Sequence, residues 1–211
     1  MRVSPKAVIF DYGNVIFNID FRKVQQAFRD LGVQNVEDFF DHRKQDGVFD
    51  LLDRGEISNA GFRDRIRELT NKPELTDTQI DDAWNSIFID TPTTYIDLLK
   101  KAKGKYRTFM LSNTNAIHEI FFTDYIKKNF GLDSNDALFE KVYYSHLVGK
   151  RKPEAAIFEQ VLTENNLKPE ETLFIDDSPQ HLEGAKKLGI HTFLMTAPDN
   201  IEKFFEREHL L

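Results

Sequence analysis

The amino-acid sequence predicts an α/β fold: a doubly wound, parallel, five-stranded sheet with a small all-helical cap inserted after the first strand. Two observations predict the sheet, since five short apolar runs lack polar alternation and helical patterns separate them. A third observation predicts the cap, because helical patterns but no convincing strand occupy the stretch from about Phe21 to about Asp90.

The predicted strands of the core are 6–10, 106–111, 141–145, 172–176 and 191–195. Continuous apolar runs of this kind are typical of strands that helices cover on both faces. The helical patterns between them are 91–104, 115–131, 152–166 and 178–189. Gly104, Gly131 and Gly189 suit the C-terminal ends of helices, and Pro153 suits a first turn, where its missing N–H leaves no bond unmade.

The inserted segment shows helical patterns at 21–32, 36–44, 58–70 and 76–88. Ser58 is the expected N-cap of one helix, and Thr76 with Gln79 forms a capping box at the start of another. We therefore predict a core domain of residues 1–18 and 92–211 and a cap domain of residues 19–91. Open α/β sheets bind ligands at the carboxyl ends of their strands, so a cap leaving that edge would cover the site.

Length and composition exclude several classes of function. The 211 residues suit one mid-sized domain with an insertion. A net charge of −7 argues against nucleic acid as a partner, and the absence of cysteine excludes disulfides and thiolate sites. No apolar run is long enough for a signal peptide or a membrane span, so we expect a cytoplasmic protein with no membrane partner. The sequence leaves open whether the protein is a monomer or a homodimer.

Polar residues follow the predicted strands at the edge where the strand ends converge. They are Asp11 after the first strand, Ser112 and Asn113 after the second, Lys152 in the loop after the third, and Asp176 and Asp177 at the fourth. Neighbouring carboxylates repel each other unless a hard cation neutralises them, and oxygen ligands suit Mg²⁺. A hydroxyl and backbone N–H groups can bind phosphate oxygens, a lysine can balance the remaining charge, and Asp11 can attack phosphorus. The pattern indicates a phosphoryl-transfer site with Mg²⁺ as its cofactor.

The order of these motifs resembles the haloacid dehalogenase (HAD) superfamily. Its four motifs correspond to "FDYGNV", "LSNTN", "KRKPEAAIF" and "FIDDSPQHLEGAKKLGI", and the helical insertion is similar to the C1 cap of that superfamily. The resemblance covers about Val8 to His191 and implies a HAD-like Rossmannoid core. The segments "GNVI", "RGEIS" and "RKPEA" resemble the sugar-phosphatase-like branch, which includes bacterial α-D-glucose-1-phosphate phosphatases.

The resemblance implies a role for each motif residue. Asp11 would be the nucleophile that forms an aspartyl-phosphate, and Lys152 would steady it, with Lys150 as the alternative cation. Ser112 and Asn113 would hold the phosphate. The magnesium ligands would be Asp11, the backbone oxygen of Gly13, Asp177, and Asp176 either directly or through water.

Gly13 departs from the superfamily pattern, since most HAD phosphatases carry a second aspartate there as general acid and base. One interpretation is a leaving group that needs little protonation, as at the anomeric carbon of a hexose 1-phosphate. Another is that a group such as His42 or His118 supplies the proton, although both histidines suit ordinary surface positions. A third is a catalytically weakened protein with a binding or regulatory role. A 2-haloacid dehalogenase is a further alternative, but it needs no Mg²⁺, which leaves the Asp176 and Asp177 pair unexplained.

We therefore expect a Mg²⁺-dependent phosphatase that hydrolyses a small phosphorylated metabolite, such as a hexose 1-phosphate, through an aspartyl-phosphate. The modest cap favours a metabolite over a protein as substrate, and cap closure would exclude water. Residues 42–58 of the cap carry the charged side chains of His42, Arg43, Lys44 and Arg54. They suit either a solvated helix face or contacts with sugar hydroxyls.

Overall fold

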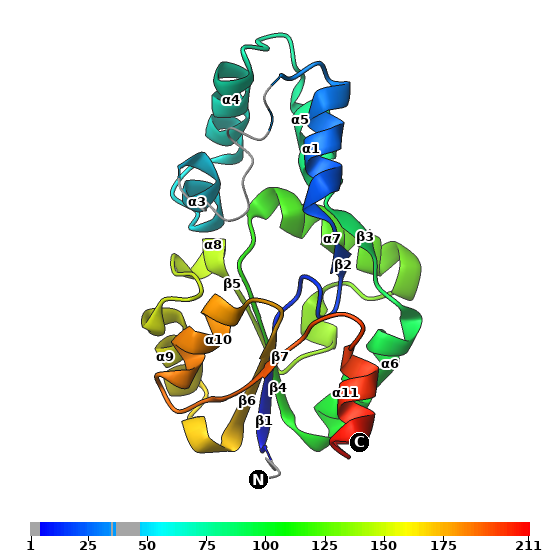
Figure 1. Ribbon diagram of the computed structural model, residues 1–211, viewed down its shortest axis with the longest axis vertical. Coiled ribbons are helices and arrows are strands. Elements are labelled where there is room, and N and C mark those ends of the chain that lie inside the picture. Colours follow the sequence, from blue (N-terminus) through cyan, green and yellow to red (C-terminus); the bar gives the residue numbers. More distant parts are fainter. Residues whose placement is uncertain (1–4, 35, 37–46) are drawn as a thin grey trace.

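A computed structural model describes residues 5–34, 36 and 47–211 of the chain. In Figure 1 the core lies below and the cap above, and the strands of the core point toward the cap with their carboxyl ends. No helix in the described part of the chain is both long enough and apolar enough to cross a bilayer.

The core contains the predicted parallel five-stranded sheet. Its strands are β1 (Ala7–Phe10), β4 (Arg107–Ser112), β5 (Lys141–Tyr144), β6 (Thr172–Asp176) and β7 (His191–Leu194). They are ordered β5-β4-β1-β6-β7, and each pairs with its neighbour in parallel. The chain adds β4 and β5 on one side of β1 and then β6 and β7 on the other. The strand order therefore reverses beside β1, which is where such sheets bind ligands.

Helices cover both faces of this sheet. They are α6 (Thr93–Lys105), α7 (Ala116–Phe130), α8 (Ser145–Val148), α9 (Ala155–Glu164), α10 (Pro179–Lys186) and α11 (Ile201–Arg207), with 3-10 turns η1 (Asn135–Ala137) and η2 (Pro169–Glu171). On β1, Val8 and Phe10 join the apolar cluster under α6 and α11, whereas Ala7 and Ile9 join the cluster under α9 and α10. Burial on both faces explains why the strand sequences are continuously apolar.

Two predicted details of the core helices are wrong. Gly104 does not end its helix, because α6 continues to Lys105. Nothing lies within 4 Å of where a Cβ at Gly104 would be, so no close contact requires a glycine there. Pro153 precedes α9 rather than occupying its first turn, since Glu154 is the N-cap. Gly131 does end α7 in the left-handed conformation, as expected.

The cap consists of helices around an apolar core of its own. Its described helices are α1 (Phe21–Asp30), α3 (Val48–Asp53), α4 (Asn59–Thr70) and α5 (Asp77–Asn85). Ser58 accepts a hydrogen bond from Gly61 N, and Thr76 with Gln79 forms the predicted capping box. Phe28, Phe62 and Trp84 lie in the apolar cluster of the cap. The predicted helix at 36–44 falls almost entirely outside the described residues.

The cap connects to the core through a short ribbon that the sequence did not predict. Strand β2 (Asn18–Ile19) pairs antiparallel with β3 (Phe88–Asp90), so the expectation of no strand before about Asp90 is wrong. We call these two strands the connecting ribbon. The predicted domain boundaries at 18/19 and 91/92 lie at or close to this ribbon, and they stay a prediction.

Candidate active site

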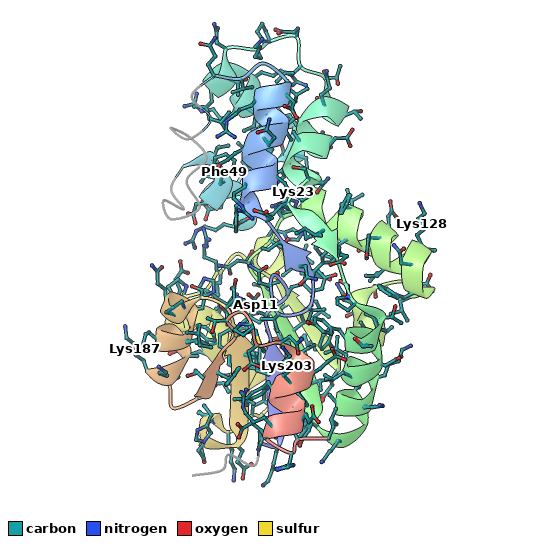
Figure 2. The ribbon with its side chains drawn as sticks, turned by 45° about the vertical axis from the view of Figure 1, so that its right-hand side comes forward. Asp11, Lys23, Phe49, Lys128, Lys187 and Lys203 are labelled. Carbon is teal, nitrogen blue, oxygen red and sulfur yellow. The ribbon has the colours of Figure 1, made fainter. Side chains whose placement is uncertain are left out.

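The site is at the carboxyl end of β1, under the cap. Figure 2 shows Asp11 at the edge of the core that faces the cap. Asp11 follows β1 directly, and its backbone N–H donates to the carbonyl of Ile175 on β6 at 2.9 Å. Asp11 is thus joined to β1 through the chain and to β6 through this hydrogen bond, and these two strands fix the position of its backbone.

Lys152 joins two of the predicted carboxylates. Its Nζ donates to Asp11 Oδ1 at 2.6 Å and to Asp176 Oδ2 at 2.7 Å. The lysine side chain is fully buried, and so is that of Asp176. Lys150, the alternative cation, instead donates to Gln160 Oε1 at 3.0 Å. Lys152 is therefore the lysine of this loop that contacts Asp11.

The charges within this buried group do not balance. Asp11, Asp176 and Asp177 bring three carboxylates, whereas Lys152 brings one ammonium group. Burial, followed by repulsion from Asp176, raises the pKa of Asp11 well above its usual range despite Lys152. Burial lowers the pKa of Lys152, but Asp11 and Asp176 outweigh it and raise that pKa, so the lysine stays charged. The excess of negative charge is what a bound divalent cation would neutralise.

Asn113 contacts Lys152, and Ser112 directly precedes Asn113 at the end of β4. Asn113 clamps the lysine backbone, because its Nδ2 donates to Lys152 O at 2.9 Å and its Oδ1 accepts from Lys152 N at 2.9 Å. The side-chain amide of Asn113 is thus occupied, whereas its backbone N–H has no backbone acceptor among the described residues and can donate to a phosphate. The hydroxyl of Ser112 at the end of β4 makes no hydrogen bond with the described residues, so it is available to a phosphate oxygen. Their phosphate-binding roles stay predictions.

Asp177 and Gly13 lie next to the connecting ribbon. Asn14, which has a left-handed φ of 55°, donates through Nδ2 to Asp177 Oδ2 at 2.9 Å. Its Oδ1 accepts from the backbone N–H of Ile19 on β2 at 3.2 Å. A Cβ on Gly13 would lie 2.8 Å from Ile19 Cδ1, so any side chain at this position has to displace Ile19. The ribbon therefore packs where the superfamily's second aspartate would begin.

His181 is a site residue that the sequence interpretation missed. Its Nδ1 lies 3.0 and 3.1 Å from the two carboxylate oxygens of Asp176, and the backbone N–H of Ser178 donates to Asp176 Oδ1 at 2.7 Å. Burial, followed by the nearby Lys152, lowers the pKa of His181. Asp176 ends β6 and His181 lies in the first turn of α10, so no helical spacing relates them and the sequence pattern carries no signal for the contact.

The donor set fits magnesium. Ligand atoms of Asp11, Asp176 and His181 lie within 4.8 Å of one another. Asp177 offers the carboxylate oxygen that Asn14 does not bind, and carboxylate and carbonyl oxygens are the ligands that Mg²⁺ prefers. Since Lys152, His181 and Ser178 already engage Asp176, Asp11 and Asp177 are the better direct ligands.

Of the two histidines that the sequence offers as proton sources, the structure describes His118. His118 is not at the surface, because only 7% of it is exposed and it stacks on Trp84 of the cap with ring centroids 4.7 Å apart. Burial lowers its pKa to about 3, so at neutral pH His118 is the neutral imidazole, which is too weak an acid to protonate a leaving group. His42 lies outside the described residues.

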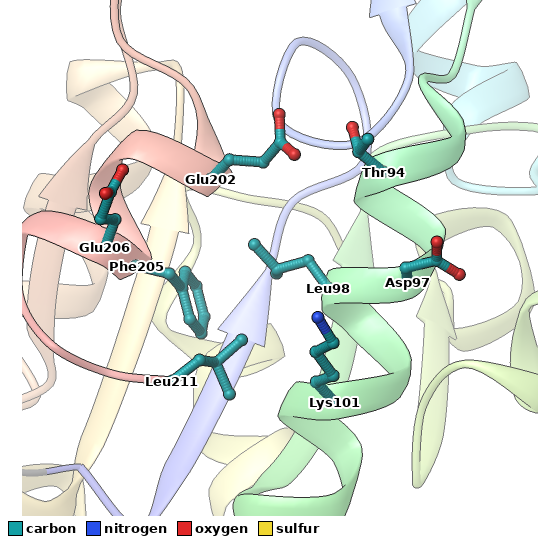
Figure 3. A pocket seen from close by; sticks show the side chains of 8 residues that line it. All are labelled: Thr94, Asp97, Leu98, Lys101, Glu202, Phe205, Glu206 and Leu211. Carbon is teal, nitrogen blue, oxygen red and sulfur yellow. The ribbon is translucent and has the colours of Figure 1, made fainter.

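A cavity of about 350 Å³ lies between α6 and α11, away from this site. Figure 3 shows its lining of Thr94, Asp97, Leu98, Lys101, Glu202, Phe205, Glu206 and Leu211. None of these residues belongs to the strand-end motifs, so the cavity does not extend the candidate active site.

Comparisons with known proteins agree with this arrangement. The model of the haloacid dehalogenase-like hydrolases matches residues 5–189. A D-ribitol-5-phosphate phosphatase of Bacteroides thetaiotaomicron is 32% identical over 188 residues, 89% of this chain and 90% of the relative. A crystal structure of a HAD family enzyme from that organism, an aspartate-to-alanine mutant in complex with magnesium and inorganic phosphate, has a TM-score of 0.87 at 38% identity. That comparison covers 95% of this chain and 98% of the other.

A second solved structure has the same architecture. A HAD-like family hydrolase from Porphyromonas gingivalis has a TM-score of 0.88 at 31% identity, covering 97% of this chain and 98% of the other. The shared fold brings the four motifs together at the carboxyl ends of β1, β4 and β6, where Lys152 binds Asp11. Because sequence and structure match over nearly its whole length, the chain belongs to the haloacid dehalogenase-like hydrolases.

Proposed function

We propose that this hydrolase is a Mg²⁺-dependent phosphatase of a small phosphorylated metabolite, a sugar or sugar alcohol phosphate, with Asp11 as its nucleophile. The observation that carries the proposal is the buried Lys152, whose Nζ lies 2.6 Å from Asp11 and 2.7 Å from Asp176. A buried ammonium group beside a strand-end carboxylate is suited to neutralising a transferring phosphoryl group. The relative named as a phosphatase and the structural neighbour in complex with magnesium and phosphate support it.

The chemistry follows from the placement of these side chains. One carboxylate oxygen of Asp11 attacks phosphorus, the bond from phosphorus to the ester oxygen breaks, and the alcohol leaves with a proton from solvent. Lys152 stabilises the negative charge on the phosphoryl oxygens, and the hydroxyl of Ser112 donates to one of them. Water then attacks the aspartyl-phosphate, which releases inorganic phosphate and restores the carboxylate. Bound Mg²⁺, held by Asp11, Asp177 and the Gly13 carbonyl, would neutralise phosphate charge and orient the ester.

The leaving group distinguishes two substrate classes. Gly13 supplies no acid, which favours an acidic leaving group such as the anomeric hydroxyl of a hexose 1-phosphate. The named relative acts on D-ribitol 5-phosphate, whose leaving group is a primary alcohol. We place hexose 1-phosphate first on the chemistry of Gly13, and a pentitol 5-phosphate is the second candidate on the strength of the relative.

A panel of phosphate esters tests the proposal. With Mg²⁺ present we expect phosphate release from hexose 1-phosphates or ribitol 5-phosphate, and we expect removal of Mg²⁺ by a chelator to abolish it. Asp11→Asn should remove activity, whereas full activity in that variant would refute the nucleophile. Chloride release from a 2-haloacid without Mg²⁺ would instead support a dehalogenase, and no release from any ester would support a binding protein.

A further inference from the structure

Helix α3 of the cap is fixed to the core loop that carries Lys152. Arg151 donates to Asp50 Oδ1. Arg54 donates through Nε to Asp50 Oδ2 at 2.9 Å and through Nη2 to Glu154. In Figure 1, α3 lies at the lower edge of the cap, directly above α8 of the core. The last turn of α3 therefore has a fixed position relative to the candidate active site.

Asp53, at the end of α3, contacts the core differently from Asp50. Its Oδ1 accepts from Asn115 Nδ2 at 3.1 Å. Its Oδ2 lies 3.9 Å from Arg151 Nη2, too far for a hydrogen bond, and has no hydrogen-bond donor among the described residues. The side chain is 20% exposed, and burial raises its pKa although Arg151 and Asn115 oppose this. Oδ2 is not among the buried atoms without a partner, so this oxygen is open to solvent and free to accept a hydrogen bond from a bound ligand.

The position of Asp53 relates it to the substrate. Asn115 belongs to the same loop as Ser112 and Asn113, and Arg151 directly precedes Lys152. Asp53 thus contacts both loops that carry the proposed phosphate-binding residues and Lys152. Figure 2 shows Asp11 at the edge of the core that faces the cap. In an in-line attack the leaving group lies opposite the nucleophile, so the leaving group of an ester attacked by Asp11 would extend toward the cap. A hydroxyl on that leaving group is the donor that Asp53 Oδ2 lacks.

We propose that Asp53 determines specificity by accepting, through Oδ2, a hydrogen bond from a hydroxyl of the leaving group. This inference rests on the proposed phosphatase function and narrows its substrates to esters of polyhydroxylated alcohols. A site with a carboxylate for a substrate hydroxyl favours substrates that carry one, since hydrogen bonds to charged groups are stronger than those between neutral groups. Aryl phosphates have no such hydroxyl and do not use Asp53.

The test compares two substrates in the full-length protein with Mg²⁺: ribitol 5-phosphate, or the hexose 1-phosphate that the panel identifies, and p-nitrophenyl phosphate. For Asp53→Ala we expect kcat/KM for the hydroxylated ester to fall roughly 10- to 100-fold, as for a lost hydrogen bond to a charged group. For p-nitrophenyl phosphate we expect a change of at most about twofold, since its leaving group offers no donor. Asp53→Asn, which keeps the size and the contact with Asn115, should lose less on the hydroxylated ester.

The matched control is Asp50→Ala, three residues earlier on the same helix. It removes the contact with Arg151 that fixes α3, so it should lower kcat/KM for both substrates by the same factor. Equal losses on both substrates in Asp53→Ala would overturn the specificity role and leave Asp53 a structural residue. Failure of the phosphatase function itself looks different, because the unmodified protein would then release phosphate from neither ester.

Discussion

At the scale of single residues, Lys152 forms two buried ion pairs at the candidate active site. Its ammonium group is fully buried between Asp11 and Asp176. Lys152→Met retains the length of the side chain but leaves both carboxylates without their cation. We expect the free energy of unfolding at pH 7 to fall by about 3–5 kcal/mol, because breaking a buried ion pair leaves an uncompensated charge.

Urea denaturation measures this loss, and Lys150→Met is its control. Lys150 is in the same loop, and among the described residues it donates to the partly exposed Gln160, so its replacement should change stability by about 0.5 kcal/mol or less. If both variants were equally stable, the pairing of Lys152 with the two carboxylates would contribute nothing to the fold.

Asn14 makes a second prediction at this scale, because it links Asp177 to the connecting ribbon. Asn14→Gly preserves the left-handed backbone at φ 55° but removes both side-chain hydrogen bonds. We expect the dissociation constant for Mg²⁺ to rise roughly 10-fold or more, as for other groups that orient a metal ligand. Isothermal titration calorimetry measures it, and Asn71→Gly is the control, since Asn71 has φ 52° and ends α4 in the cap. Unchanged Mg²⁺ affinity in Asn14→Gly would count against Asp177 as a ligand.

The sequence predicts that Asp11, Lys152 and Asp176 lie together. Asp11 follows β1, Asp176 ends β6 and Lys152 precedes α9, and the carboxyl ends of parallel strands meet at one edge of the sheet. The sequence does not show that the side-chain amide of Asn113 forms hydrogen bonds with the Lys152 backbone, since a motif gives a residue type and not its hydrogen-bond partner. His181 was missed for a similar reason, because its contact with Asp176 depends on how α10 leaves β6.

At the scale of elements, the burial of a strand determines whether its sequence pattern predicts it. The inner strands β1, β4 and β6 are buried almost throughout, so their sequences are apolar runs that differ from helices and loops. The connecting ribbon is two and three residues long, with partly exposed side chains, and leaves no periodic pattern. The sequence predicts a helix end at Gly104, but α6 continues one residue further, to Lys105, because a glycine within a helix costs only about 1 kcal/mol.

The attachment of α3 to the core gives a prediction for this scale. Gly55 follows α3 with φ 69°, and a Cβ there would lie 2.3 Å from the carbonyl oxygen of His146. Gly47 precedes α3 with φ 81° and nothing within 4 Å. Both alanine variants lose about 1–2 kcal/mol to the left-handed backbone, but Gly55→Ala also meets the core and should lose about 1–3 kcal/mol more.

Urea denaturation compares the two glycine variants, and kcat/KM on a sugar phosphate shows whether the cap is displaced. We expect lower kcat/KM in Gly55→Ala alone, because only that substitution pushes α3 away from His146. Equal stability and activity in the two variants would mean that the contact between Gly55 and His146 does not hold the cap.

At the scale of the whole molecule, the cap and the core are joined by an aromatic interface as well as by ion pairs. The apolar cluster of the cap includes Ile117 from α7 of the core. The adjacent His118 stacks on Trp84, lies 5.0 Å from Phe88 in an edge-on contact, and pairs through Nδ1 with Asn85 Oδ1 at 2.9 Å. With the proton assigned to Nδ1, the imidazole donates to Asn85 Oδ1, and burial among these rings favours its neutral form.

His118 therefore makes stability depend on pH. Burial lowers its pKa from 6.5 to about 3 in the folded protein, whereas the unfolded chain binds the proton near pH 6.5. The unfolded state thus holds more protons between these values, and stability is complete above pH 6.5 and falls as the pH drops. From pH 7 to pH 5 this one group should remove about 2 kcal/mol from the free energy of unfolding. Urea denaturation at pH 7 and at pH 5 measures how much free energy of unfolding is lost between the two values. This loss should be about 2 kcal/mol smaller in His118→Phe than in the unmodified protein. It should be unchanged in the control His191→Gln, at the start of β7. The same pH dependence in all three proteins would show that His118 takes up its proton without disturbing the contact between cap and core.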